Sequence, residues 1–174
     1  MGLAAELATV GALIRRSANE ILRVPGAAIP GVLAPTIFFC GLSAVFGSLT
    51  LLPGFATDSY QSFIIPVSML QGAGFTGAAT GVNLARDIEQ GWFDRLLASP
   101  APRSALLAGM VSSAALRSLI PSVVLLAVAF AIGVNWPGVG GLLLALICVM
   151  GTATIAACWA VALALRTAPR PPRR

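Results

Sequence analysis

The hydrophobic residues of this chain gather in long uncharged runs that are separated by short polar stretches. Four runs could each form a helix that crosses a bilayer, at residues 29–52, 61–82, 104–134 and 139–165. The first has 24 residues. At about 1.5 Å per residue it would extend roughly 36 Å and cross a ~30 Å hydrocarbon core with some tilt. The pattern predicts an all-α membrane protein with about four transmembrane helices, in a transmembrane domain over residues 29–165.

Residues 1–28 have a different pattern, which is typical of a helix on the membrane surface. Apolar residues recur at spacings of three and four and form one stripe, at Leu3, Leu7, Val10, Ile14, Ala18 and Ile21. Charged residues such as Arg15 and Arg16 occupy other positions of the helical wheel. We therefore predict an amphipathic interfacial helix that ends near Pro25. Its charges come too late in the chain for a signal peptide.

Glycines in the second run predict close helix packing. Gly77 and Gly81 form a GxxxG pair, and Gly72 and Gly74 lie just before them. Small residues at this spacing let a neighbouring helix approach closely, which matters in lipid because no hydrophobic effect drives helices together there. We expect Gly77 and Gly81 to be helix-packing positions.

Arg117 interrupts the third run. A charged residue at the bilayer centre costs about 2.5–3.5 kcal/mol on insertion scales. Residues 118–134 are just long enough to span without it. We expect the third helix to begin on the inner side of the membrane, with Arg117 near the inner interface as a topology anchor. A pore-lining or acid-paired role is the alternative.

Composition supports lipid as the solvent. Hydrophobic residues make up 57% of the 174 positions and charged residues only 10%, whereas soluble domains are about 25% charged. A chain of this kind has too few polar residues to cover its surface in water.

The basic residues define an orientation. All eleven are Arg, and ten of them lie in residues 1–28, 83–103 and 166–174, whereas the turns at 53–60 and 135–138 have none. By the positive-inside rule both termini and the middle loop are cytoplasmic, in a multi-pass protein of the plasma membrane. The same distribution makes a topology signal a better explanation of the net charge of +5 than nucleic-acid binding.

The chain offers little for catalysis. It has no His, and its three cysteines, Cys40, Cys148 and Cys158, lie singly inside apolar runs. We predict no catalytic residues and no metal site. A proton-coupled transporter is disfavoured because all six acids lie outside the predicted spans.

The middle loop, residues 83–103, is the most informative segment. Apolar residues fall at four-residue steps, at Leu84, Ile88, Trp92 and Leu96, with Phe93 and Leu97 beside them. Polar or charged residues occupy other positions, at Arg86, Asp87, Glu89, Gln90, Asp94 and Arg95. This predicts a short amphipathic helix, or two pieces broken at Gly91. Its charged face could bind a cytoplasmic partner, or the loop could be interfacial and solvated without one.

The residues of this loop resemble a known family. The sequences RDIEQG at 86–91 and DRLLASP at 94–100 resemble the cytoplasmic loop of type-2 ABC transporter permeases, above all the daunorubicin-resistance-type drug and antibiotic exporters. The positions that match are Glu89, Gly91, Asp94, Arg95, Leu96, Leu97 and Pro100. Trp92 departs from the pattern, because a small hydroxyl residue is commoner there.

The resemblance implies a function and partners. Residues 1–28 would be a connecting helix, and the loop would contain a coupling helix that docks on a separate ATPase subunit through Glu89, Gly91, Trp92, Asp94, Arg95, Leu96, Leu97 and Pro100. The chain would be the permease subunit of an exporter for drugs, antibiotics or other amphipathic molecules. It would pair with a second permease subunit, identical or different. It would hydrolyse nothing and need no cofactor, because the partner binds ATP.

The family normally has six spans, whereas four are predicted here before a Pro/Arg tail at residues 166–174. We therefore expect a truncated member. The alternative is a non-transporting accessory or scaffold protein, or an inactive permease fragment.

Overall fold

The described part of the chain consists of helices. The computed structural model describes residues 10–16, 19, 29–51, 59–98, 102–135 and 137–167, and these contain no strand. The elements after residue 28 are α2 (Ile29–Phe46), η2 (Gly47–Leu51), α3 (Tyr60–Glu89), α4 (Trp92–Leu97), α5 (Arg103–Arg117), α6 (Leu119–Ala131) and α7 (Gly138–Thr167). Residues 10–16 are also helical. The prediction of an all-α protein is confirmed.

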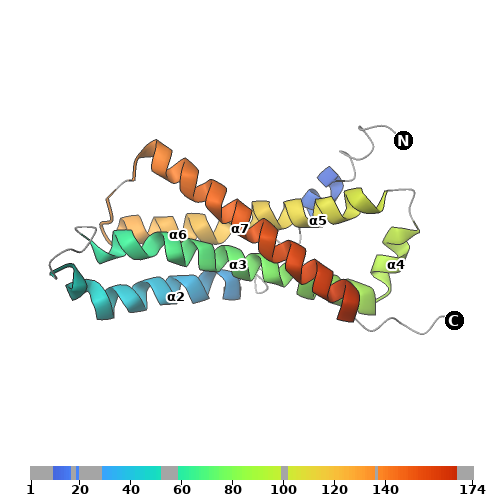
Figure 1. Cartoon of the computed structure of the whole chain (residues 1–174), viewed down its shortest axis with the longest axis horizontal. Helices are drawn as coiled ribbons and strands as arrows, with labels where there is room; N and C mark the ends of the chain where they lie inside the picture. Colours follow the sequence, from blue (N-terminus) through green and yellow to red (C-terminus); the bar gives the residue numbers. More distant parts are fainter. Residues whose placement is uncertain are drawn as a thin grey trace.

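The long helix α3 is the centre of the bundle. It packs against α2, α5, α6 and α7, and α7 crosses it at a large angle (Figure 1). The residues 10–16, the end of α3, α4, the start of α5 and the end of α7 lie toward one end of the molecule, which we call the α4 end (Figure 1). The opposite end, with η2 and the connection from α6 to α7, is called the η2 end.

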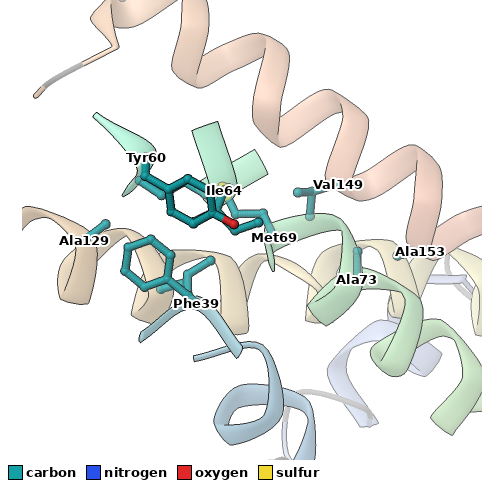
Figure 2. Close-up of a cluster of buried hydrophobic side chains, with 10 residues drawn as sticks. Phe39, Tyr60, Ile64, Met69, Ala73, Ala129, Val149 and Ala153 are labelled. Carbon is teal, nitrogen blue, oxygen red and sulfur yellow. The ribbon is translucent and has the colours of Figure 1, made fainter. Parts of the chain in front are cut away.

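A buried apolar cluster holds the half of the bundle nearer the η2 end together. It joins α2, α3, α6 and α7, with Phe39, Ala73, Ala129 and Ala153 fully buried. Figure 2 shows the Phe39 and Tyr60 rings close to Ile64 and Met69, and Val149 of α7 near Ala73. Because most side chains at the α7 contacts are small, the helices can approach closely.

The outward surface is as apolar as the interior. On α7, large apolar side chains are exposed along the whole helix, at Val139, Leu143, Leu144, Ile147, Ile155, Trp159 and Leu163. Such a face is unfavourable in water and stable in lipid. Three segments of the described chain are long and apolar enough to cross a membrane: Gly31–Leu51, Arg103–Ala131 and Gly138–Thr167. The protein is therefore membrane-embedded.

The second predicted span differs from the other three. α3 covers residues 61–82 and extends to Glu89, which makes it long enough, but it is not among the segments apolar enough to span by composition. Its central position explains the difference. Four other helices cover much of its surface, and glycines, Gln71 and buried hydroxyls such as Ser68 lower its mean hydropathy. Its remaining face is apolar and exposed, at Phe63, Val67, Phe75 and Val82.

The third predicted span is divided between α5 and α6 at Ser118. Pro121 lies in the first turn of α6, and proline has no N–H to donate to the carbonyl of Arg117. The helical hydrogen bonding is therefore interrupted directly after Arg117, within the segment Arg103–Ala131 that is long enough to span.

Candidate functional site at the α4 end

The connection from α3 to α4 is a sharp turn. Gly91 has φ +69°, in the left-handed region that a side chain disfavours. Its N–H donates to Ile88 O and that of Gln90 to Arg86 O, both at 3.0 Å. The chain therefore leaves α3 and starts α4 in a new direction (Figure 1). We call residues 89–92 the elbow.

One side of α4 is anchored in the bundle. Phe93 and Leu96 pack against a second buried cluster, formed by Leu84, Ile88, Met110, Val161 and Ala164. These residues come from α3, α5 and α7. α4 is six residues long, too short to be stable as an isolated helix, so this packing fixes its position.

The stripe that the sequence suggested through the middle loop is divided by the elbow. Leu84 and Ile88 lie in the buried cluster, and a continuous helix would place Trp92 and Leu96 against the same cluster. Instead, Phe93 packs beside Leu96 on the inner side of α4. Trp92 lies elsewhere, under Arg16. The cause is the left-handed conformation of Gly91, which interrupts the helical register.

The exposed residues of α4 and of the positions that flank it are mostly polar. Glu89, Asp94 and Arg95 are exposed, as are Gln90 and Ala98, while Leu97 is half-buried. This surface, which we call the α4 outer face, carries charges of both signs on a rigidly held helix. It is an arrangement that can bind a polar partner surface.

Arg16 connects the N-terminal segment to this site. Its two amino nitrogens donate to both carboxylate oxygens of Asp87 at 3.2–3.4 Å. Its guanidinium carbon lies 3.6 Å from the centroid of the Trp92 ring. Sequence reasoning missed this contact. Arg16 was one of several polar residues on the wheel, and no local spacing rule relates residues 71 positions apart.

The predicted coupling residues therefore have different environments. Glu89, Asp94 and Arg95 are exposed, Trp92, Leu96 and Leu97 are half-buried, and Gly91 forms the turn. Pro100 lies outside the described residues. Contact with an ATPase remains a prediction for all of them.

The predicted packing glycines lie where α3 crosses α7. A Cβ on Gly77 would be 2.6 Å from Ala153 O, and one on Gly81 would be 2.6 Å from Ala160 C. Real Cβ atoms essentially never lie this close to backbone atoms. The absence of a side chain at both positions permits the close crossing.

Arg117 contacts α3 at Thr80, which lies between Gly77 and Gly81 in the sequence. It is half-buried, and its Nη2 donates to Thr80 Oγ1 at 2.9 Å. Thr80 is six residues before Arg86, a distance of about 9 Å along a helix. Arg117 is also the fifteenth of the 29 residues of Arg103–Ala131, so its place near the inner interface stays a prediction.

Several buried hydroxyl groups bond to their own helices. Ser68 donates to Ile64 O, and Ser122 donates to Ser118 O at 2.9 Å. Such bonds satisfy the hydroxyls within the helix. They are packing features of the interior, with none of the geometry of an activated nucleophile.

The fold and the site together define a polytopic α-helical membrane protein with a braced, amphipathic helix at one end. The model of the ABC-2 type transporter family matches residues 8–169, and the chain belongs to this family. It is thus a transmembrane permease component of ABC transporters, a part that is not itself catalytic. No curated protein and no solved structure matches the chain.

Proposed function

We propose that this chain is the permease subunit of an ABC exporter whose energy comes from a separate ATPase subunit, and that this subunit docks on the α4 outer face. The observation that carries the proposal is the two-sided character of α4. Phe93 and Leu96 attach it to the bundle, whereas Asp94 and Arg95 are free of the core and exposed.

The packing supplies a route for motion. A displacement of α4 acts on α3, α5 and α7, because Phe93 and Leu96 contact a cluster that draws on these three helices. The tight crossing at Gly77 and Gly81 couples α3 to α7 further along the bundle. ATP binding by the partner would in this way favour one of two arrangements of the helices, inward-open or outward-open.

The proposed orientation follows from charge. Arginines of the described chain gather at the α4 end, at Arg15, Arg16, Arg86, Arg95, Arg103 and Arg166, whereas the described residues at the η2 end have no charged side chain. By the positive-inside rule the α4 end would face the cytoplasm, where ATP is available, in a protein of the plasma membrane.

The substrate class we propose is amphipathic: drugs, antibiotics or other such molecules. The helices present mostly apolar side chains with occasional hydroxyls and Arg117, an environment that favours molecules with an apolar body and few polar groups. A second permease subunit, identical or different, would complete the translocation path.

The test is co-purification from membranes of cells that also produce a candidate ATPase subunit. Asp94→Ala should leave the permease folded and lower its association with the ATPase by about tenfold, a typical effect at an interface hot spot. Leu96→Ala should lower association as well as thermal stability, because Leu96 contacts the core. Arg103→Ala, an exposed change at the same end, is the matched control and should leave association unchanged.

Two outcomes would overturn parts of the proposal. If the chain associates with no ATPase subunit, the docking role is wrong. If it associates but supports no efflux of amphipathic drugs from cells, the chain acts as a non-transporting accessory protein instead.

A further inference from the structure

We propose that Arg16 is a positioning residue for α4: its guanidinium, held between the Asp87 carboxylate and the Trp92 ring, locks the elbow so that α4 and the N-terminal segment move together. We call this arrangement the Arg16 clamp. The clamp itself is a property of this chain alone. Its consequence, efficient transmission of force from the ATPase to the bundle, rests on the proposed function.

The geometry uses both parts of the guanidinium group. The edge donates to Asp87 through Nη1 and Nη2, and the face lies over Trp92. A planar guanidinium can do both at once, because its N–H groups lie in the plane and its faces remain free. A lysine ammonium has no such plane, so the clamp requires Arg at this position.

The clamp is partly sheltered from solvent. The Asp87 side chain is 19% exposed and that of Arg16 is 41% exposed. A fully exposed ion pair contributes little and fluctuates. Here the carboxylate is mostly covered and the cation rests on an aromatic ring, so the pair is held in one geometry.

The N-terminal segment is itself anchored near the clamp. Leu13 is buried, and a Cβ on Gly109 of α5 would lie only 2.5 Å from Leu13 Cδ1. The segment therefore contacts α5 through Leu13 and contacts α3 and the start of α4 through Arg16. A short stretch of the chain thus joins the three helices that meet at the elbow.

The elbow is where such a lock matters. Gly91 has nothing within 4 Å of the position of a Cβ, so packing does not restrain the turn itself. Without the clamp, only the packing of Phe93 and Leu96 would hold α4. The start of α4 could then shift at Gly91 when a partner presses on the outer face, and part of the motion would be lost. With Trp92 held under Arg16, the first residue of α4 is fixed to the neighbouring segment.

The first test measures the distance between two spin labels in the purified permease, without any ATPase. Cys40, Cys148 and Cys158 are replaced by Ala, and labels are attached at Ala12→Cys and Ala98→Cys, both exposed positions. We expect a narrow distance distribution in the parent. Arg16→Gln and Arg16→Lys should each widen it about twofold or more, as loss of a bidentate, stacked contact implies.

Variants of the ring and matched controls sharpen this test. Trp92→Phe keeps an aromatic face, so its distance distribution should be nearly as narrow as that of the parent, whereas Trp92→Leu should widen the distribution. Arg15→Gln removes an exposed charge from the neighbouring position and should leave the distance distribution unchanged. If the Arg16→Gln, Arg16→Lys and Trp92→Leu distributions all superimpose on the parent, the clamp is wrong, whatever the ATPase experiments show.

The second test measures coupling in vesicles that contain the permease and its ATPase. Arg16→Lys should lower the number of substrate molecules moved per ATP hydrolysed by several-fold while leaving the KM for ATP unchanged, and Trp92→Phe should largely retain coupling. A merely structural role would reduce the amount of folded complex and leave this ratio as it is. An unchanged ratio in Arg16→Lys would overturn the positioning role.

Discussion

At the scale of single residues, two glycines leave no room for a side chain where α3 meets α7. Gly77 and Gly81 face backbone atoms of α7, so no flexible side chain can move aside to accommodate a larger residue. Gly74, on the same helix, has open space beside it. The three glycines therefore should respond differently to the same substitution.

Gly81→Ala should destabilise the fold. Its Cβ would lie 2.5 Å from Ala160 O, and overpacking of this kind typically costs about 1–3 kcal/mol. Gly74→Ala is the matched control and should leave the free energy of unfolding unchanged or raise it by up to about 1 kcal/mol, because Ala favours a helix. Unfolding in mixed micelles, followed by circular dichroism, measures both. Equal stability of the two variants would contradict the observed crossing.

Thr80 provides a second residue-scale prediction. Its hydroxyl accepts from Arg117 at 2.9 Å, so Thr80→Val should lower the free energy of unfolding by about 0.5–2 kcal/mol. Thr154 donates to Met150 O of its own helix, and Thr154→Val should have a smaller effect. In an Arg117→Leu background the effect of Thr80→Val should largely disappear. Strictly additive effects would argue that the bond is not formed in the membrane.

At the scale of elements, the elbow joins the bundle to the surface proposed to bind the ATPase. The left-handed conformation of Gly91 lets a six-residue helix turn back onto the core, where Phe93 and Leu96 pack half-buried against it. The same turn directs Asp94 and Arg95 outward. The conformation of one residue thus decides which residues of α4 a partner can reach.

Gly91→Ala should test this conformation. The position has open space, so the change introduces no collision, and only the backbone is strained, by about 1–2 kcal/mol. We expect weaker co-purification with the ATPase than for the parent. Gly91→Asn should be closer to the parent, because Asn tolerates the left-handed region better than Ala. If both variants co-purify with the ATPase as well as the parent does, the conformation of the turn does not control docking.

The elements differ in how far the sequence could predict them. The apolar runs predicted the positions of α2, α5–α6 and α7, and Gly91 indicated the break in the middle loop, because these signals are local. The register of α4 could not be predicted, since a helical wheel continues through a turn that the chain does not follow. The pairing of Arg16 with Asp87 was equally inaccessible, because it depends on how distant segments fold together.

At the scale of the whole molecule, the charge distribution separates two ends. The described η2 end has no charged side chain, and the α4 end holds most of the described arginines. Together with the apolar outer surface of α7, this makes the bundle a membrane-spanning unit with one charged end. Between the two ends the described helices carry one charged side chain, Arg117, and lipid must cover this length.

The orientation can be measured with single cysteines in a chain that lacks its own three. A cysteine in place of Asn135, at the η2 end, should react with a membrane-impermeant maleimide in intact cells, because we place it outside. A cysteine in place of Gln90 should react only after the membrane is opened. The reverse pattern would place the elbow outside the cell, where no ATPase could use it.

The most direct measurement of the central claim is photo-crosslinking from the α4 outer face in living cells. A photoreactive amino acid in place of Arg95 should capture an ATPase subunit, recognised by mass spectrometry through its nucleotide-binding motifs, and the same group in place of Val139 at the η2 end should not. Capture of no ATPase from position 95, or equal capture from both positions, would contradict the account.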